Sequence, residues 1–146
     1  MAVNGWTLYA YPAFDAQFRR LAERAEAARL ANPASENSAA KLLASINKLI
    51  LGIIPANPGA PQFRQCNTLG KNNRHWFRAK FHERYRLFFR FSTKDKIIVY
   101  AWVNDESTLR KRGSKTDPYS LFQAMLKSGD PPESLQQLIA ASRKMK

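Results

Sequence analysis

The sequence predicts an α+β fold in which an antiparallel sheet of about four strands packs on an N-terminal helical hairpin, with further helices at the C-terminal end. Two kinds of periodicity predict it. Residues 76–105 alternate with the two-residue period of half-buried strands. Residues 13–32 and 38–53 instead repeat apolar side chains every three or four positions, which is the spacing of amphipathic helices. A length of 146 residues suits one domain, so we expect residues 1–146 to form a single unit.

The chain is expected to begin with a short strand and two helices. Residues 6–10 are apolar and lie between a glycine and a proline, which predicts a first strand that can join the sheet. The first helix should end at Pro33, because the residue before a proline is pushed out of the helical region. The second helix should start near Ser38 and stop within residues 52–55. Its predicted buried residues are Leu42, Leu43, Ile46, Leu49, Ile50 and Ile53.

Three strands are expected after a long irregular loop at residues 55–73, with turns near residues 82–84 and 92–95. Because successive side chains of a strand point to opposite faces, alternation divides these strands into two sets. The expected core face holds Phe77, Ala79, Phe81, Tyr85, Leu87, Phe89, Phe91, Ile97, Val99, Ala101 and Val103. The opposite face is expected to hold Trp76, Arg78, Lys80, Arg86, Phe88, Arg90, Tyr100, Trp102 and Asn104.

Two helices are expected at the C-terminal end, after a hydrophilic segment at residues 106–116. Asp117 followed by Pro118 is typical of a helix N-cap with proline at the first helical position. This helix should run to Gly129. Residues 130–133 repeat the cap-and-proline pattern and predict the start of a last helix.

The charge of the chain indicates a polyanionic partner. Twenty-four Lys and Arg residues against 11 Asp and Glu residues give a formal charge of +13, which favours nucleic acid over an acidic protein or a membrane surface. A membrane is disfavoured because no apolar run is expected to reach the length of a spanning helix. The N-terminal segment lacks the pattern of a signal peptide, so we expect a cytoplasmic protein. Cys66 stands alone and no metal-binding or phosphate-binding motif occurs, so neither a metal nor a cofactor is expected.

The second face of the sheet is the candidate binding surface. Charged residues on the wet side of a sheet are an ordinary outcome of folding, but all the charges at these positions are positive. Large aromatic residues lie among them, and such residues are either covered or stack on a ligand. With the basic groups that flank the strands, the candidate nucleic-acid contacts are Arg74, Arg78, Phe88, Arg90, Tyr100, Trp102, Asn104, Lys111, Arg112 and Lys115.

Several strings of the sequence resemble the RelE/ParE superfamily of bacterial toxin–antitoxin modules and, within it, the YhaV-type toxins. They are VNGWTLYA, FHERYRLFFRFS, WVNDE and KTDPYSLFQAMLKSGDPP, and the resemblance covers nearly the whole chain. It implies a RelE-like fold and a ribonuclease that cleaves mRNA. It also implies silencing by a bound PrlF-like antitoxin, and ribosome association is common in the superfamily.

The resemblance also implies catalytic positions: Lys80 on a strand, Arg86 in a Tyr-Arg pair, Arg110 or a neighbour, and Tyr119 in the next helix. Arginine and lysine at these places suit attack of a ribose 2′-OH on the adjacent phosphate, because their charges stabilise the phosphate oxygens. His82 could exchange a proton, although an exposed turn histidine is an equal interpretation. Two alternatives stay open: a non-catalytic toxin of the ParE kind that inhibits a protein target, and a plain RNA-binding module.

Overall fold

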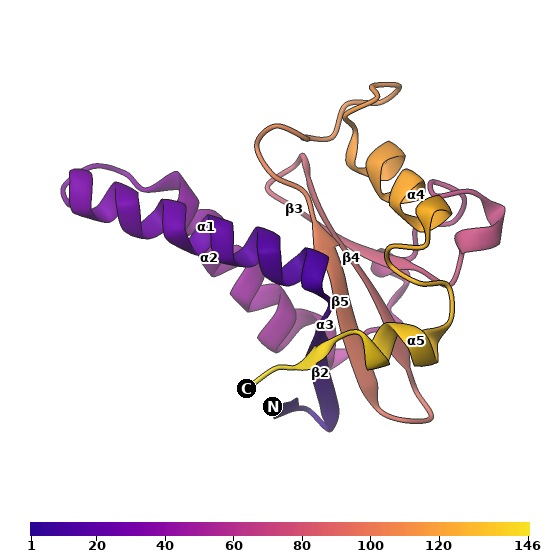
Figure 1. The fold of residues 1–146 in the computed structure, drawn as a ribbon. Helices are drawn as coiled ribbons and strands as arrows, with labels where there is room; N and C mark the ends of the chain where they lie inside the picture. Colours follow the sequence, from indigo (N-terminus) through magenta and orange to yellow (C-terminus); the bar gives the residue numbers. More distant parts are fainter.

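The computed structural model describes residues 1–146 and confirms an α+β architecture, with a central sheet between two layers of helices (Figure 1). The strands are β1 (Ala2–Val3), β2 (Trp6–Ala10), β3 (Phe77–Phe81), β4 (Tyr85–Ser92), β5 (Ile97–Val103) and β6 (Arg143–Lys144). Their order across the sheet is β1-β2-β5-β4-β3, and β6 also pairs with β2. Strands β3, β4 and β5 pair antiparallel as predicted, whereas β2 runs parallel to β5. The first strand therefore joins the sheet as expected, and it makes the sheet mixed.

The predicted helical hairpin is confirmed as α1 (Pro12–Ala31) and α2 (Ser38–Lys48), which cover one face of the sheet (Figure 1). Asn37 joins the two helices. Its side-chain oxygen accepts a hydrogen bond from the Ala40 backbone N–H at 3.0 Å, and its amide donates to the Ala25 carbonyl at 2.9 Å. One side chain therefore caps the start of α2 and ties it to α1.

The second helix does not stop within residues 52–55 as predicted. It continues through a π-helical turn, Leu49–Ile53, into the short helix α3 (Ile54–Ala56). Because a π-turn is wider than an α-turn, it shifts the buried positions along the chain. Ile54 is fully buried, whereas Ile53, a predicted core residue, is 39% exposed.

This continuation also corrects the expectation that no apolar run reaches membrane-spanning length. Residues Ser38–Ala56 form one helical run of 19 residues with a mean hydropathy of 1.5, which is long and apolar enough to cross a membrane by length and composition alone. In the structure its apolar side packs into the core between the hairpin and the sheet, through residues such as Leu42, Ile46 and Ile50. The expectation failed because Gly52 and Pro55 do not end the helix.

The strand β5 contains an irregularity that reverses part of the predicted alternation. Phe88 pairs with Trp102 and Phe89 with Tyr100, so Ala101 has no partner on β4. Such a bulge inserts one residue, so the side chains before it in the strand lie on the faces opposite to those predicted. Tyr100 and Ile98 therefore lie in the core under the hairpin. Ile97, Val99 and Ala101 were predicted to lie on the core face. This prediction is wrong, because the three residues pack on the side of the C-terminal helices.

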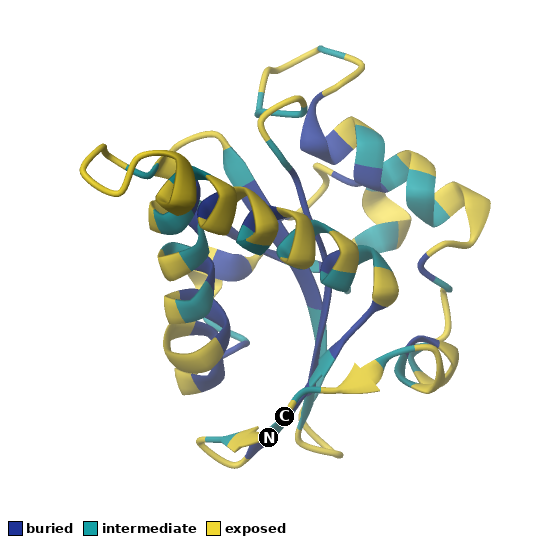
Figure 2. Cartoon of the chain, turned by 60° about the vertical axis from the view of Figure 1, so that its left-hand side comes forward, coloured by how far each residue is buried: buried dark blue, intermediate teal, exposed yellow.

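The second layer of helices consists of α4 (Pro118–Ser128) and α5 (Leu135–Ala140). As predicted, Asp117 caps α4 and Gly129 follows it in a left-handed conformation, with φ of 84°. The last helix, however, begins at Leu135 with Ser134 as its cap. The Asp130 side chain, which was predicted to start this helix, instead accepts a hydrogen bond from the Tyr11 hydroxyl. Figure 2 shows buried residues along the strands and the inner sides of the helices, and exposed residues on their outer sides.

Candidate active site

A cluster of three arginines surrounds the hydroxyl and ring of Tyr119. Arg78 Nε on β3 donates a hydrogen bond to the Tyr119 hydroxyl at 2.9 Å, and Arg86 Nε on β4 donates to the same oxygen at 3.1 Å. The Arg110 guanidinium, from the loop before α4, lies 4.6 Å from the centre of the Tyr119 ring. Adjacent strands, a loop and a helix thus bring together residues that are far apart in the sequence. This set is called the arginine–tyrosine cluster below.

The two strand arginines of the cluster are held in place by backbone carbonyls. Arg78 Nη1 donates to the carbonyls of Gln62 and Arg64 at 2.9 and 2.8 Å. Arg86 Nη1 donates to those of Glu83 and Tyr85 at 2.8 and 2.9 Å. Both residues are buried, at 9% and 7% exposure, and neither faces a carboxylate within salt-bridge distance. Their Nη2 groups make no hydrogen bond within the chain and are not sealed from solvent, so each guanidinium keeps donors for an anion.

The hydrogen bonds of Tyr119 leave its own proton available. A tyrosine hydroxyl has two acceptor sites and one donor. The two arginines occupy the acceptor sites, and the hydroxyl donates to no group of the chain. The residue is 5% exposed and two arginines donate to its oxygen, so this hydroxyl lies in a confined and strongly cationic space. Such a group can donate to an oxygen that gains negative charge during a reaction.

Asp117 connects the loop that carries Arg110 with the helix that carries Tyr119. One carboxylate oxygen accepts from the Lys111 backbone N–H at 2.7 Å and pairs with Arg110 Nη1 at 2.8 Å. The other accepts from the Tyr119 backbone N–H at 3.0 Å, which is the helix cap. The residue is 1% exposed. The Asp-Pro pair predicted the cap but not the ion pair, because sequence spacing does not show that Arg110 lies beside Asp117.

Asn104, a predicted nucleic-acid contact, instead fixes the strand end to the following loop. Its side-chain oxygen accepts from the Arg86 backbone N–H at 2.8 Å. Its amide donates to the carbonyls of Arg84 and Thr108 at 3.2 and 2.7 Å. With 4% exposure, the side chain is fully used inside the protein, and its effect on the site acts through the position of Arg86.

Lys80 and His82 have different surroundings. Lys80 pairs directly with Arg86 across β3 and β4, so both side chains lie on the same face, and the Lys80 side chain is exposed. His82 lies in the turn after β3 with φ of 44°, and its Nε2 is 2.6 Å from the Ser45 hydroxyl on α2. The histidine is therefore turned toward the hairpin side of the sheet, and the structure does not bring it to the arginine–tyrosine cluster.

The predicted stacking aromatics are covered by protein. Phe88 stacks on Phe122 of α4 with ring centres 4.4 Å apart, and Trp102 is parallel to the same ring at 6.0 Å. Tyr100 lies on the opposite face, where its hydroxyl donates to the Ile50 carbonyl at 2.7 Å and burial raises its pKa. None of the three offers a free ring face to a base. The strong aromatic signal of this sheet thus reflects packing under α4 and under the hairpin.

The remaining predicted contacts are spread around the site. Arg90 lies 5.4 Å from the Trp76 ring centre and donates to the Glu133 carbonyl at 2.8 Å, and burial lowers its pKa. Arg74 donates to the side chain of Asn67 at 2.7 Å. Lys111, Arg112 and Lys115 are exposed on the loop next to Arg110. These loop cations are the part of the predicted binding set that stays free beside the cluster.

A groove adjoins the cluster along the outer edge of β3, and it is called the edge groove below. Its volume is about 550 Å³. Its apolar wall includes Leu49, Ile53 and Pro61, and its charged lining residues are Arg64, Arg78 and Lys80. Arg64 is a candidate that sequence analysis missed, because the irregular loop gives no pattern that would place it beside the strands.

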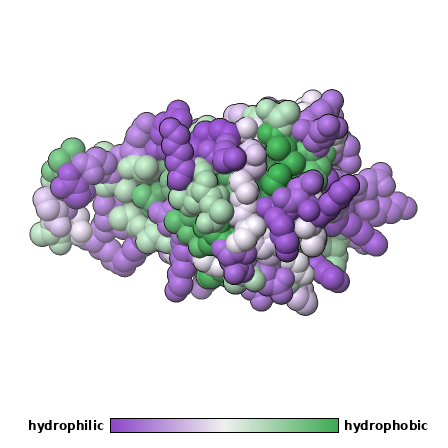
Figure 3. Space-filling model, turned by 90° about the horizontal axis from the view of Figure 1, so that it is seen from below, coloured by the Kyte–Doolittle hydropathy of each residue, from purple (hydrophilic) through white to green (hydrophobic).

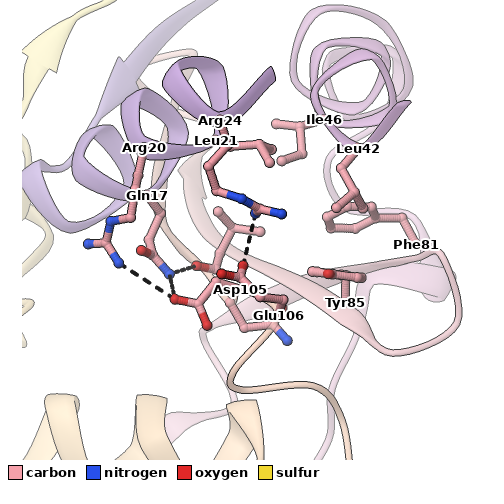
Figure 4. A pocket seen from close by; sticks show the side chains of 12 residues that line it. Gln17, Arg20, Leu21, Arg24, Leu42, Ile46, Phe81, Tyr85, Asp105 and Glu106 are labelled. Atoms are coloured by element: carbon pink, nitrogen blue, oxygen red, sulfur yellow. Dashed lines mark hydrogen bonds and ion pairs between the residues drawn. The ribbon is translucent and has the colours of Figure 1, made fainter. Parts of the chain in front are cut away.

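A second hollow lies on the hairpin side of the sheet, between α1, α2 and the end of β5 (Figure 4). Apolar side chains such as Leu21, Leu42 and Phe81 line it. At its rim, Arg20 lies 3.6 Å from Asp105 and Arg24 lies 2.9 Å from Glu106. Cations and carboxylates therefore neutralise each other there, whereas Arg78 and Arg86 of the arginine–tyrosine cluster have no carboxylate partner.

Comparison with known proteins identifies the family. A family described as "Toxin with endonuclease activity, of toxin-antitoxin system" matches residues 8–143. Toxin YhaV of Escherichia coli O6:H1 is 46% identical over 140 residues, covering 93% of this chain and 91% of that protein. Ribonuclease toxin YhaV of Escherichia coli strain K12 is 45% identical, with the same coverage. A chain in the solved toxin–antitoxin complex RelBE2 of Mycobacterium tuberculosis is similar with a TM-score of 0.43 and 16% identity, over 69% of this chain and 98% of that one. The resemblance seen in the sequence is confirmed: the chain belongs to the YhaV family of endonuclease toxins from toxin–antitoxin systems.

Proposed function

We propose that this toxin is an endoribonuclease that cleaves mRNA by attack of a ribose 2′-OH, and that the arginine–tyrosine cluster carries the reaction. The observation that supports this most is the Tyr119 hydroxyl, which accepts from two arginines while its own proton has no acceptor. The name of a relative, Ribonuclease toxin YhaV, supports RNA as the substrate class.

In the proposed reaction the 2′-oxygen attacks the adjacent phosphorus and the bond from phosphorus to the 5′-oxygen breaks. The products are a 2′,3′-cyclic phosphate and a free 5′-OH, and the 2′-OH proton is released to solvent. Negative charge grows on the nonbridging oxygens and on the leaving 5′-oxygen. The free donors of Arg78 and Arg86, with Lys80 beside them, are assigned to the nonbridging oxygens.

Tyr119 is assigned to the leaving group. It would donate its proton to the 5′-oxygen as the bond breaks, which is general acid catalysis. The phenolate oxygen left behind would be held by Arg78 Nε and Arg86 Nε, and the charge of Arg110 lies over the same ring. Solvent then returns the proton. Cationic side chains thus stabilise the negative charge that a metal ion stabilises in many nucleases. We therefore propose cleavage without a metal.

The antitoxin is the expected protein partner, since the family consists of toxins from toxin–antitoxin systems. We further propose that it is PrlF-like, that it is acidic where it meets this toxin, and that the pair acts in the cytoplasm. The charge of +13 supports an acidic partner. We also propose that the toxin contacts the ribosome while it cleaves mRNA, because ribosomal RNA is a polyanion and the toxin carries a charge of +13.

The proposal is tested by incubating purified toxin with a short RNA and with the same strand carrying a 2′-deoxy sugar at the cut site, each with and without EDTA. RNA should be cut to a cyclic or 3′-phosphate and a 5′-OH in both conditions, and the 2′-deoxy strand should stay intact. Cleavage of the 2′-deoxy strand, or loss of cleavage in EDTA with the fold intact by circular dichroism, would show a different mechanism.

A further inference from the structure

The edge groove lies where the sheet ends. Strand β3 is the last strand, paired only with β4, and its outer edge is bridged only at Phe77 by Arg64. Beyond that bridge the outer edge of β3 has no strand partner, and two residues of this strand, Arg78 and Lys80, line the groove. The opposite wall is the π-turn of the second helix, which includes Leu49 and Ile53. The groove is thus an open channel between the end of the sheet and a helix.

The charge of the groove is of one sign. All three charged residues that line it, Arg64, Arg78 and Lys80, are positive. The hollow of Figure 4 has arginines too, but Asp105 and Glu106 lie beside them. Unlike that hollow, the edge groove combines a cationic lining with the absence of a lining carboxylate, which suits a polyanion.

The groove also offers apolar surface. Leu49, Ile53 and Pro61 form part of its apolar wall, and the view from below shows that apolar areas also alternate with hydrophilic ones elsewhere on the surface (Figure 3). Ile53 is 39% exposed, and Pro61, which also lines the groove, is exposed as well. A nucleobase or ribose can pack on such a wall while its phosphate contacts the cations. The volume of about 550 Å³ lies within the range of roughly 300–1,000 Å³ that is typical of ligand pockets.

The groove is continuous with the proposed cleavage site. Arg78 lines the groove, and the same residue donates from Nε to the Tyr119 hydroxyl. Lys80 also lines the groove and pairs with Arg86 across the strands. A strand of RNA that leaves the arginine–tyrosine cluster past Arg78 therefore enters the groove directly.

We propose that the edge groove is a subsite for single-stranded RNA, which binds a nucleotide flanking the cleaved bond. Its phosphate contacts the side chains of Arg64 and Lys80, and its base or sugar packs on Ile53 and Pro61. This inference rests on the proposed function, because it takes the arginine–tyrosine cluster as the place of cleavage. It adds Arg64, Ile53 and Pro61, which no pattern of the sequence places beside the strands.

The test measures binding separately from cleavage. The probe is a fluorescent oligouridylate with 2′-O-methyl groups, which cannot be cut by 2′-OH attack. Arg64→Ala should raise its Kd several-fold and reduce the slope of log Kd against log salt by about 0.7, the effect of one lost phosphate contact on a single strand. Arg29→Ala is the matched control, because it removes one exposed arginine far along α1, where Arg29 pairs with Glu26.

A second pair of variants tests the apolar wall. Ile53→Asp should weaken probe binding at least as much as Arg64→Ala. Leu51→Asp should have the effect of a single added negative charge only, because Leu51 is 38% exposed on the same turn but does not line the groove. Both positions are exposed, so circular dichroism and Tm should match those of the unaltered toxin.

The outcomes separate this inference from the proposed function. Equal Kd values and salt slopes for Arg64→Ala and Arg29→Ala, with equal effects at positions 53 and 51, would overturn the subsite even if the toxin cuts RNA. If Arg64→Ala bound the probe normally but bound the antitoxin more weakly, the groove would belong to the protein partner. That result would also overturn the RNA subsite. Failure of the unaltered toxin to cut RNA, with probe binding still sensitive to Arg64, would refute the cleavage mechanism and keep the RNA groove.

Discussion

Replacing Asp117 by asparagine should lower both stability and turnover, because both of its carboxylate oxygens are in use. One oxygen serves Lys111 N–H and Arg110, and the other caps α4 at Tyr119 N–H. An asparagine has one acceptor oxygen, so its NH₂ group must face a donor on one side. At 1% exposure water does not replace the lost acceptor. Leaving a buried donor unpaired costs about 1–3 kcal/mol, so we expect Asp117→Asn to lose about 2 kcal/mol of unfolding free energy.

The effect on cleavage should come from Arg110. Without its ion pair, the guanidinium is no longer fixed above the Tyr119 ring, and misplaced groups near a reacting centre can cost up to about 100-fold in rate. We expect kcat to fall about 10- to 100-fold while KM changes little. The measurements are urea denaturation for stability and single-turnover cleavage for rate. Ser134→Ala is the control: it removes the cap of α5, costs about 1 kcal/mol and should leave kcat unchanged.

A double-mutant cycle decides whether Asp117 acts through Arg110. If it does, Asp117→Asn should reduce kcat strongly in the unaltered toxin and hardly at all in an Arg110→Ala background. Multiplicative losses in the double variant would refute this reasoning, and so would a stability loss without any change of kcat.

Two further predictions concern stability. Ile54→Ala should cost about 2–5 kcal/mol in urea denaturation and Ile53→Ala less than about 0.5 kcal/mol, because the π-turn buries the first side chain and exposes the second; equal costs would contradict the π-turn. Burial and the charge of Arg90 hold the pKa of His75 below its ordinary 6.5, although Glu133 opposes them, so the folded protein binds this proton more weakly than the unfolded chain. The resulting penalty is full below the lowered pKa and is lost as pH rises through 6.5, so His75→Gln should flatten the dependence of Tm on pH there. A slope that stays unchanged would show that other groups cause it.

The fold could be predicted because its two periodicities are local. Alternation on β3 and β4 correctly placed Lys80 and Arg86 on one face, opposite the core, and the Asp-Pro pair correctly placed the start of α4. Parity failed on β5, because one unpaired residue, Ala101, shifts every side chain before it. No local pattern of the sequence predicts this bulge, which places Tyr100 in the core under the hairpin.

The site could be predicted only in part, for a related physical reason. Sequence patterns indicate which face of an element a residue occupies, and not which elements come together. Arg78 was predicted as a nucleic-acid contact, and its bond to Tyr119 depends on how α4 lies over β3. The same applies to His82, whose contact with Ser45 follows from the left-handed turn that directs it toward α2.

The central claim is that Tyr119 protonates the leaving 5′-oxygen, and a change of leaving group tests it most directly. An RNA in which sulfur replaces the 5′-oxygen at the cut site needs no proton donor, because a thiolate leaves without one. Tyr119→Phe keeps the ring under Arg110 and removes only the hydroxyl. We predict that this variant cuts the oxygen substrate about 10²- to 10⁴-fold more slowly than the unaltered toxin, the usual range for a general acid, and cuts the sulfur substrate at nearly the same rate. An equal loss on both substrates would contradict the account and reduce Tyr119 to a support for Arg78 and Arg86.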